Sequence, residues 1–226
     1  MIYMLDTANL NAIRKAFDIY PITGVTTNPT IISKENRDFI GLLKEIREII
    51  GEDTMLHAQV IGKSAEDMIK EAKYLNETIG GNFYVKIPVT KEGIKAIRVL
   101  SKEGINITAT AIFTAQQALM AAVSGAKFVA PYVNRIDNIS GNGVEVVKDI
   151  IEELKLYNLD CKVLAASFKN VQQVQDLSRN GVHSVTVNPD IMDKMLEHPL
   201  TDWSVDQFIN DWEKVYGEGK LTTDVK

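Results

Sequence analysis

Lys86 lies near the end of a short apolar segment, residues 83–88, where a lysine amine could do carbonyl chemistry. In a strand, side chains alternate between two faces, so Phe83, Val85 and Ile87 share one face and Tyr84 and Lys86 the other. Burial disfavours the charged form of an amine, and a neutral amine can attack a carbonyl to form an iminium. The alternative is a lysine whose ammonium reaches solvent or pairs with Asp6.

The same alternation, applied to other short apolar segments, predicts further polar side chains on the face of Lys86. Leu56, Ala58 and Val60 point outward, which leaves Gln59 inward. In the segment at residues 161–167, Ser167 lies on the opposite face from Leu164 and Ala166, and we expect it to point inward. All these polar residues fall late in their segments, which predicts one ring of polar groups: Asp6, Thr26, Asn28, Gln59, Lys86, Thr110, Tyr132 and Ser167.

Imine chemistry also needs groups that move protons. Gln59 does not titrate, so it could only orient a water molecule, whose hydrogen bonds Thr110 and Tyr132 could complete. Tyr132 is the best candidate for the proton donor and acceptor. Asp6 could handle substrate protons or orient Lys86.

A second group of residues is suited to a phosphate. Arg135 follows the apolar segment at residues 127–133, and the planar guanidinium group of an arginine suits the oxygen atoms of a phosphate. Ser167 precedes a predicted helix, whose free N–H groups attract anions, and Lys169 is close by in sequence. The alternative for Arg135 is a solvated side chain on a loop.

Strand-like segments alternate with helical patterns along the chain, which indicates parallel βαβ units. The expected strands are residues 2–6, 23–27, 55–61, 83–88, 105–111, 127–133, 161–167 and 184–188. Eight short units favour a single closed (β/α)8 TIM barrel, and no GxGxxG or P-loop motif follows the first strand. We therefore expect an α/β protein with the barrel at 1–203 and, in the same domain, a C-terminal helix and tail at 204–226.

The apolar face of the expected helix at 204–216 carries Val205, Phe208, Ile209, Trp212 and Val215. It could pack on its own barrel or on a neighbouring subunit.

The composition excludes several classes of function. The 226 residues carry a net charge of −5, so no global positive field attracts nucleic acid or an anionic membrane. One cysteine and three scattered histidines predict no metal site. Long apolar stretches and a leader peptide are not recognisable, so we expect a cytoplasmic protein with neither membrane nor nucleic-acid partners.

Five motifs carry a resemblance to a known family: LDTAN at 5–9, GVTTNP at 24–29, VKIPVT at 85–90, APYVNRID at 130–137 and LAASFK at 164–169. With them the chain resembles the small-subunit branch of the transaldolase family over residues 1–216, most closely its fructose-6-phosphate aldolase members. The resemblance implies a barrel whose Schiff-base lysine is Lys86, with Asp6 and Asn28 in the site and Arg135 and Ser167 on the phosphate. It also implies no metal, no organic cofactor, sugar-phosphate substrates and a homo-oligomer, commonly a decamer assembled through C-terminal helices.

Two positions divide this family. Transaldolases resemble one another in having a glutamate at the position of Gln59 and a phenylalanine at that of Tyr132. The resemblance to the aldolase members therefore implies a class I aldolase that reversibly cleaves fructose 6-phosphate to dihydroxyacetone and glyceraldehyde 3-phosphate.

Three alternatives remain. A transaldolase would pass a dihydroxyacetone unit from sedoheptulose 7-phosphate to glyceraldehyde 3-phosphate, giving erythrose 4-phosphate and fructose 6-phosphate. The others are a non-catalytic phosphosugar-binding barrel and a barrel isomerase with Asp6 as its base.

Overall fold

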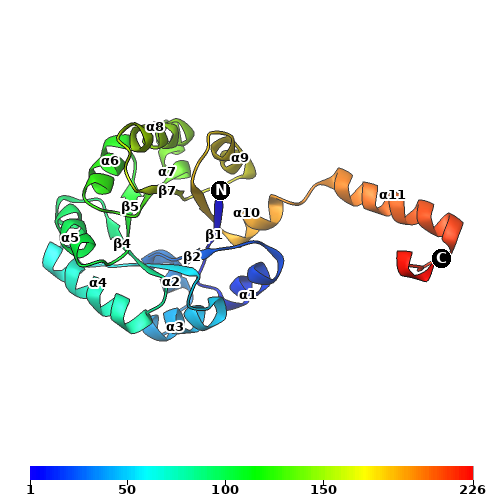
Figure 1. Cartoon of the computed structure of the whole chain (residues 1–226), viewed down its shortest axis with the longest axis horizontal. Coiled ribbons are helices and arrows are strands. Elements are labelled where there is room, and N and C mark those ends of the chain that lie inside the picture. The colour runs from blue at the N-terminus through cyan, green and yellow to red at the C-terminus, as the bar shows by residue number, and fades with distance from the viewer. Residues whose placement is uncertain (226) are drawn as a thin grey trace. The chain divides into compact units, whose positions relative to one another are not determined.

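Parallel strands form a closed barrel in the computed structural model, which describes residues 1–225 (Figure 1). Each strand pairs with the next in sequence, and the last pairs with the first. The strands are β1 (Ile2–Asp6), β2 (Gly24–Thr26), β3 (Met55–Gln59), β4 (Phe83–Pro88), β5 (Ile107–Ile112), β6 (Phe128–Pro131), β7 (Lys162–Ala165) and β8 (Ser184–Val187). The predicted (β/α)8 TIM-barrel fold is confirmed.

Helices surround the barrel and follow its strands along the chain (Figure 1). They are α1 (Leu10–Ile19), α2 (Pro29–Lys34), α3 (Phe39–Ile50), α4 (Ala65–Ile79), α5 (Lys91–Lys102), α6 (Ala115–Val123), α7 (Val133–Asp137), α8 (Gly143–Leu156), α9 (Val171–Arg179) and α10 (Pro189–Lys194). After them in the chain come α11 (Pro199–Tyr216) and the 3-10 turn η1 (Thr222–Asp224). Within residues 1–225, no helix is long and apolar enough to cross a membrane.

A polar cap starts most of the barrel helices. A side-chain oxygen accepts the backbone N–H three residues later, which satisfies one of the free donors of the first turn. The residues that do this are Asn9, Asn28, Asp38, Ser64, Thr90, Thr114, Asn142 and Asn170. These caps fix where each helix begins and so hold the loops at the C-terminal ends of the strands.

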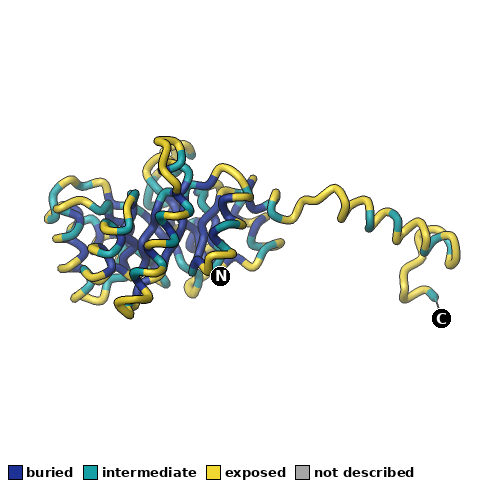
Figure 2. The backbone as a smooth tube through the Cα atoms, turned by 90° about the horizontal axis from the view of Figure 1, so that it is seen from above, coloured by how far each residue is buried: buried dark blue, intermediate teal, exposed yellow. Residues whose placement is uncertain are grey.

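Two apolar layers stabilise the barrel, and most residues of its strands are buried (Figure 2). Outward side chains such as Val85 and Ile87 are fully buried against the helices. An inner cluster contains Met4, Phe128 and Leu164. Leu164 thus points into the barrel, and the sequence-based assignment of the faces of β7 is wrong.

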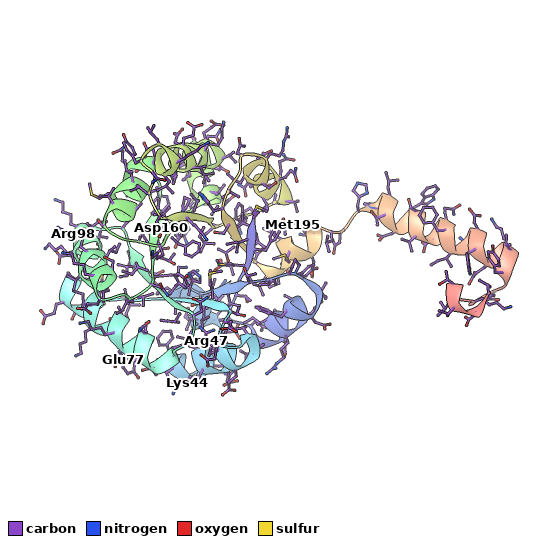
Figure 3. The ribbon with its side chains drawn as sticks, in the orientation of Figure 1. Lys44, Arg47, Glu77, Arg98, Asp160 and Met195 are labelled. Atoms are coloured by element: carbon purple, nitrogen blue, oxygen red, sulfur yellow. The ribbon has the colours of Figure 1, made fainter. Side chains whose placement is uncertain are left out.

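The loop between α3 and β3 is closed by a buried arginine, Arg47 (Figure 3). Its Nη1 atom donates to the carbonyl oxygens of Gly51 and Thr54, both at 2.7 Å. Burial lowers the pKa of Arg47, an effect that the charge of Glu52 opposes. These bonds fix the start of β3.

The chain divides into two compact units, residues 1–191 and 192–226. In the second unit, α11 begins at Pro199, five residues before the expected start at 204. It has no buried residue within the described chain. The Trp212 indole N–H donates to the Lys220 carbonyl at 2.8 Å, which folds the following segment back onto the helix.

Candidate active site

A cavity of about 520 Å³ opens among the loops at the C-terminal ends of the strands. In TIM barrels this face carries the active site. Its lining is Asp6, Thr7, Asn28, Thr30, Ile31, Lys34, Glu35, Lys86, Tyr132, Asn134, Arg135, Asn138, Ala166, Ser167, Phe168, Lys169, Asn188 and Pro189. Seven of the ten predicted site residues are among them, and Thr26, Gln59 and Thr110 are not.

Lys86 lies on β4 with only 5% of its surface exposed. Its Nζ atom donates a hydrogen bond of 2.7 Å to the backbone carbonyl of Thr27, at the end of β2. This bond holds the amine across the inside of the barrel, toward the first strands. A substrate carbonyl that entered the cavity would meet an amine with little access to water.

Asp6 is one of the two carboxylates that line this cavity, and Glu35 is the other. Thr26 donates to its Oδ1 atom at 2.7 Å, and the Thr186 hydroxyl lies 2.7 Å from that of Thr26. Burial raises the pKa of Asp6 above its ordinary value, while the charge of Lys86 and the Thr26 hydrogen bond act in the opposite direction. Thr26 thus reaches the site through Asp6 and orients its carboxyl group.

Tyr132 is held on three sides. Its hydroxyl lies 3.0 Å from the Thr110 hydroxyl, the guanidinium of Arg135 lies 4.8 Å from its ring centroid, and Phe113 packs edge-on against the ring. Thr110 therefore acts behind Tyr132, not in the lining of the cavity. These contacts fix a phenolic hydroxyl near the cavity of Lys86.

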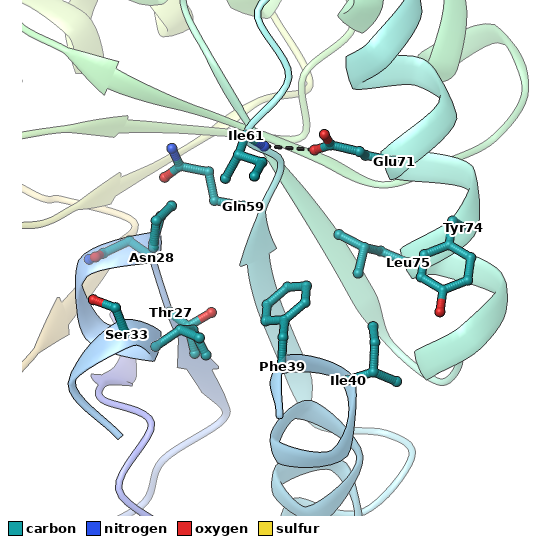
Figure 4. A pocket seen from close by; sticks show the side chains of 12 residues that line it. Thr27, Asn28, Ser33, Phe39, Ile40, Gln59, Ile61, Glu71, Tyr74 and Leu75 are labelled. Carbon is teal, nitrogen blue, oxygen red and sulfur yellow. Dashed lines mark hydrogen bonds between the residues drawn. The ribbon is translucent and has the colours of Figure 1, made fainter. Parts of the chain in front are cut away.

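Gln59 faces a second cavity of about 460 Å³ (Figure 4). Apolar side chains from α2, α3 and α4 form most of its wall: Ile32, Phe39, Ile40, Tyr74 and Leu75. The Glu71 carboxylate accepts the backbone N–H of Ile61, two residues after Gln59, at 2.7 Å (Figure 4). Asn28 lines both cavities and so lies where the two spaces meet, whereas Gln59 lines the second cavity and is absent from the lining of the first.

Asn28 also starts α2, since its Oδ1 atom accepts the Ile31 N–H at 3.0 Å. That bond leaves the side-chain NH₂ group to face the cavities.

Besides Lys86, three basic side chains line the first cavity: Arg135, Lys169 and Lys34. Lys34, in the last turn of α2, was not predicted from the sequence. The alternation of side chains applies to strands and so could not place a residue on a helix, and Lys34 belongs to none of the sequence motifs.

Ser167 lines the cavity as expected, but for a different reason. It has a φ of 62°, in the left-handed region, so the backbone has left the strand before this residue. Ala166, its neighbour, also lines the cavity.

His57 is a buried residue that the sequence reasoning missed. It is fully buried on the inward face of β3, its Nδ1 atom lies 2.9 Å from the Thr108 hydroxyl, and its ring stacks on Tyr84 at 4.6 Å. Burial lowers the pKa of His57 well below its ordinary value, and the charge of Lys86 lowers it further. The alternation that placed Gln59 inward could have found it.

Among the residues described, no three His, Cys, Asp or Glu side chains gather closely enough to hold a metal ion.

The site geometry can be set beside known proteins. The model of the transaldolase/fructose-6-phosphate aldolase family matches residues 3–219. The chain belongs to this family. It is 44% identical to a probable transaldolase of Thermoanaerobacter sp. (strain X514) over 95% of this chain and 98% of the relative. It is 40% identical to a probable fructose-6-phosphate aldolase of Streptococcus pneumoniae over 94% of this chain and 96% of the relative.

These names bear on the site in one respect. Family membership indicates an enzyme, either a transaldolase or an aldolase, and the names of these two relatives divide in the same way. A probable transaldolase of Clostridioides difficile (strain 630) is also 43% identical, over 94% of this chain and 97% of the relative.

The state of His57 gives a testable pH dependence. Its pKa is lower in the folded protein than in the unfolded chain, so below about pH 6.5 the unfolded chain takes up a proton that the folded protein does not. Stability is therefore retained above this pH and lost as the pH falls, by about 1.4 kcal/mol per pH unit. His57→Phe keeps a planar ring against Tyr84 and removes this contribution.

Urea unfolding between pH 7.5 and 5 measures the contribution of His57 to the free energy of unfolding. The wild type should lose stability more steeply than His57→Phe below pH 6.5. Burial also lowers the pKa of His183, and this contribution is the same in both proteins. Parallel curves would show that His57 is protonated in the folded protein.

Proposed function

We propose that this family member is a class I aldolase that reversibly cleaves fructose 6-phosphate to dihydroxyacetone and glyceraldehyde 3-phosphate. The observation that carries the proposal is the buried amine of Lys86, which shares one cavity with Asp6, Tyr132 and three cations. A neutral amine there attacks the ketone at C2 and forms an iminium with loss of water.

Bond cleavage then needs a base and an electron acceptor. The base takes the proton of the C4 hydroxyl, the C3–C4 bond breaks, and its electron pair passes to the iminium to give an enamine. Glyceraldehyde 3-phosphate leaves at this stage. Asp6 suits the role of base because it lies in the same cavity, and burial raises its pKa above the ordinary value, which makes the carboxylate a stronger base.

The fate of the enamine separates an aldolase from a transaldolase. An aldolase protonates it at C3 and hydrolyses the resulting iminium to release dihydroxyacetone. We assign the proton donation to Tyr132, whose hydroxyl is oriented by Thr110, and water orientation to the Gln59 amide. Transfer to erythrose 4-phosphate is the second candidate, and the names of two of the relatives favour it.

The phosphate of the substrate is assigned to Arg135, Ser167 and Lys169. An arginine can bind two phosphate oxygens at once, and the charge of Lys169 adds attraction. The net charge of the chain is −5, so attraction to an anion must come from such a local group.

A homo-oligomer is the second part of the proposal. On α11, Phe208 is 71% and Val215 is 72% exposed, an arrangement expected of a helix face that a partner covers. We assign this face to contact with another copy of the chain, and a decamer is the assembly that the family resemblance implies.

Lys86 should be trapped by reduction. With dihydroxyacetone and borohydride, the mass of the peptide that carries Lys86 should increase by the reduced adduct, because borohydride converts the iminium to a stable amine. Peptide mass spectrometry measures this, with the enzyme treated without dihydroxyacetone as control. An adduct on another lysine, or on none, would refute the Schiff-base assignment.

Gln59 and Tyr132 should control the choice of reaction. Tyr132→Phe removes the proposed donor, so release of free dihydroxyacetone should fall by about 10²-fold, in the range of general acid catalysis. Gln59→Glu should move turnover toward transfer, measured with fructose 6-phosphate in the presence and absence of erythrose 4-phosphate. Wild-type cleavage that depends strictly on erythrose 4-phosphate would favour the transaldolase.

The α11 face should be necessary for assembly. Phe208→Asp places a charge in the apolar face and should lower the mass measured by light scattering after gel filtration. Asn210→Asp adds the same charge to an exposed polar position of the same helix and should leave the mass unchanged. A wild-type monomer, or equal masses in all three proteins, would contradict the assignment.

A further inference from the structure

Two backbone segments bring cations to the cavity. Arg135 lies on α7, after β6, whereas Ser167 and Lys169 lie in the loop after β7. Arg135 and Lys169 carry like charges, so they repel each other until an anion neutralises them. The protein must therefore fix their separation through other contacts.

Backbone bonds join the two segments at one end. The N–H of Asn134 donates to the Ser167 carbonyl at 2.8 Å, and that of Val133 donates to the Ala166 carbonyl at 3.0 Å. These bonds hold the first turn of α7, but they leave its last turn and Lys169 to be fixed separately.

Gln173, in the first turn of α9, makes that second connection. Its Oε1 atom accepts the Lys169 backbone N–H at 2.9 Å, and its Nε2 atom donates to the Asp137 Oδ2 atom at 2.7 Å and to the Asn134 Oδ1 atom at 3.4 Å. Gln173 is buried and is not part of the cavity lining. One amide group thus joins the loop of Lys169 to both ends of α7.

Asp137 extends this connection to a third helix. Its Oδ1 atom accepts the N–H of Gly143, the first residue of α8, at 2.7 Å. A Cβ atom at Gly143 would lie 2.4 Å from the Val133 carbonyl oxygen, so α8 packs too closely against α7 for a larger residue. Both carboxylate oxygens are therefore committed, one to α8 and the other to Gln173.

We propose that Gln173 is a positioning residue for the phosphate of the substrate, which it does not touch. By holding α7 and the Ser167–Lys169 loop at a fixed separation, it presets Arg135, Ser167 and Lys169 for one anion. This inference rests on the proposed function, in which those three residues bind the phosphate.

The direction of the Gln173–Asp137 hydrogen bond allows a sharp test. Gln173→Glu keeps the shape and the acceptor for Lys169 but sets two carboxylates against each other. Asp137→Asn alone sets two amides together, so that a donor faces a donor or the Gly143 contact is lost. The double variant restores one donor and one acceptor in reversed order, because the new amide at position 137 can donate to the new carboxylate at position 173.

Gln172→Glu is the matched control. Gln172 is the neighbouring residue on α9, and its Nε2 atom donates to the Asp176 carboxylate at 2.8 Å on the exposed face. The substitution makes the same charge change and places two carboxylates together in the same way, but away from the cavity lining.

KM is then compared for glyceraldehyde 3-phosphate and for unphosphorylated glyceraldehyde as acceptors in synthesis. Each single variant should raise KM for the phosphorylated acceptor about tenfold, a loss equivalent to one hydrogen bond, and change that for glyceraldehyde less than about twofold. The double variant should return within about threefold of the wild type. Equal rises for both acceptors, or no recovery in the double variant, would overturn the proposal.

Binding of inorganic phosphate, measured by calorimetry, separates this proposal from the proposed reaction because it needs no turnover. Gln173→Glu should weaken phosphate binding about tenfold while Lys86 is still trapped with dihydroxyacetone. Unchanged phosphate binding in the variant, or none in the wild type, would overturn the role of Gln173. Phosphate binding without aldol turnover in the wild type would instead contradict the aldolase.

Discussion

The hydrogen bond from the Lys86 Nζ atom to the Thr27 carbonyl is the interaction on which the site depends. A buried amine needs a polar partner, because an unpaired polar group in the barrel interior would cost stability. That partner is backbone, and it lies where β2 ends and the chain turns toward α2. The position of the amine is therefore set by the closure of the barrel itself, and the other site groups are arranged around it.

Polar groups lie in connected pairs behind the cavity. Thr26 orients Asp6, Thr110 orients Tyr132, and Gln173 joins the segments that carry the cations. In each case a residue away from the lining holds a residue or segment that lines the cavity. Such preorganisation reduces the reorganisation needed when charge moves during reaction.

Strand alternation predicted from the sequence that Lys86, Asp6 and Tyr132 point inward. This worked because one face of each strand in a closed barrel packs against the helices and the other faces the barrel interior. The same reasoning is wrong for β7, where Leu164 points inward and Ser167 reaches the cavity through a left-handed backbone. A φ value cannot be obtained from the alternation of residue types. The fold was predictable for a related reason, since eight short segments with helices between them admit few arrangements.

Residues outside the strands were harder to predict. Lys34 and Gln173 lie on helices, where their relation to the cavity depends on tertiary packing. The Asn28 cap, in contrast, could have been recognised from the Asn-Pro pair that precedes an apolar helical pattern. Gln59 lies at the end of β3, as the sequence predicted. The cavity that it lines, among α2, α3 and α4, cannot be predicted from the alternation of residues in a strand.

Asn28 both caps α2 and lines the two cavities, which limits the substitutions that this position can accept. One end of its amide starts α2, and the other faces the meeting point of two cavities. A substitution of Asn28 that altered the cavity lining would also remove the cap, so the two properties cannot vary independently at this position. The side chains of Phe39 and Ile40, in the apolar wall of the second cavity, cap no helix. Changes in the shape of the second cavity, by natural drift or in the laboratory, are therefore least costly on that wall.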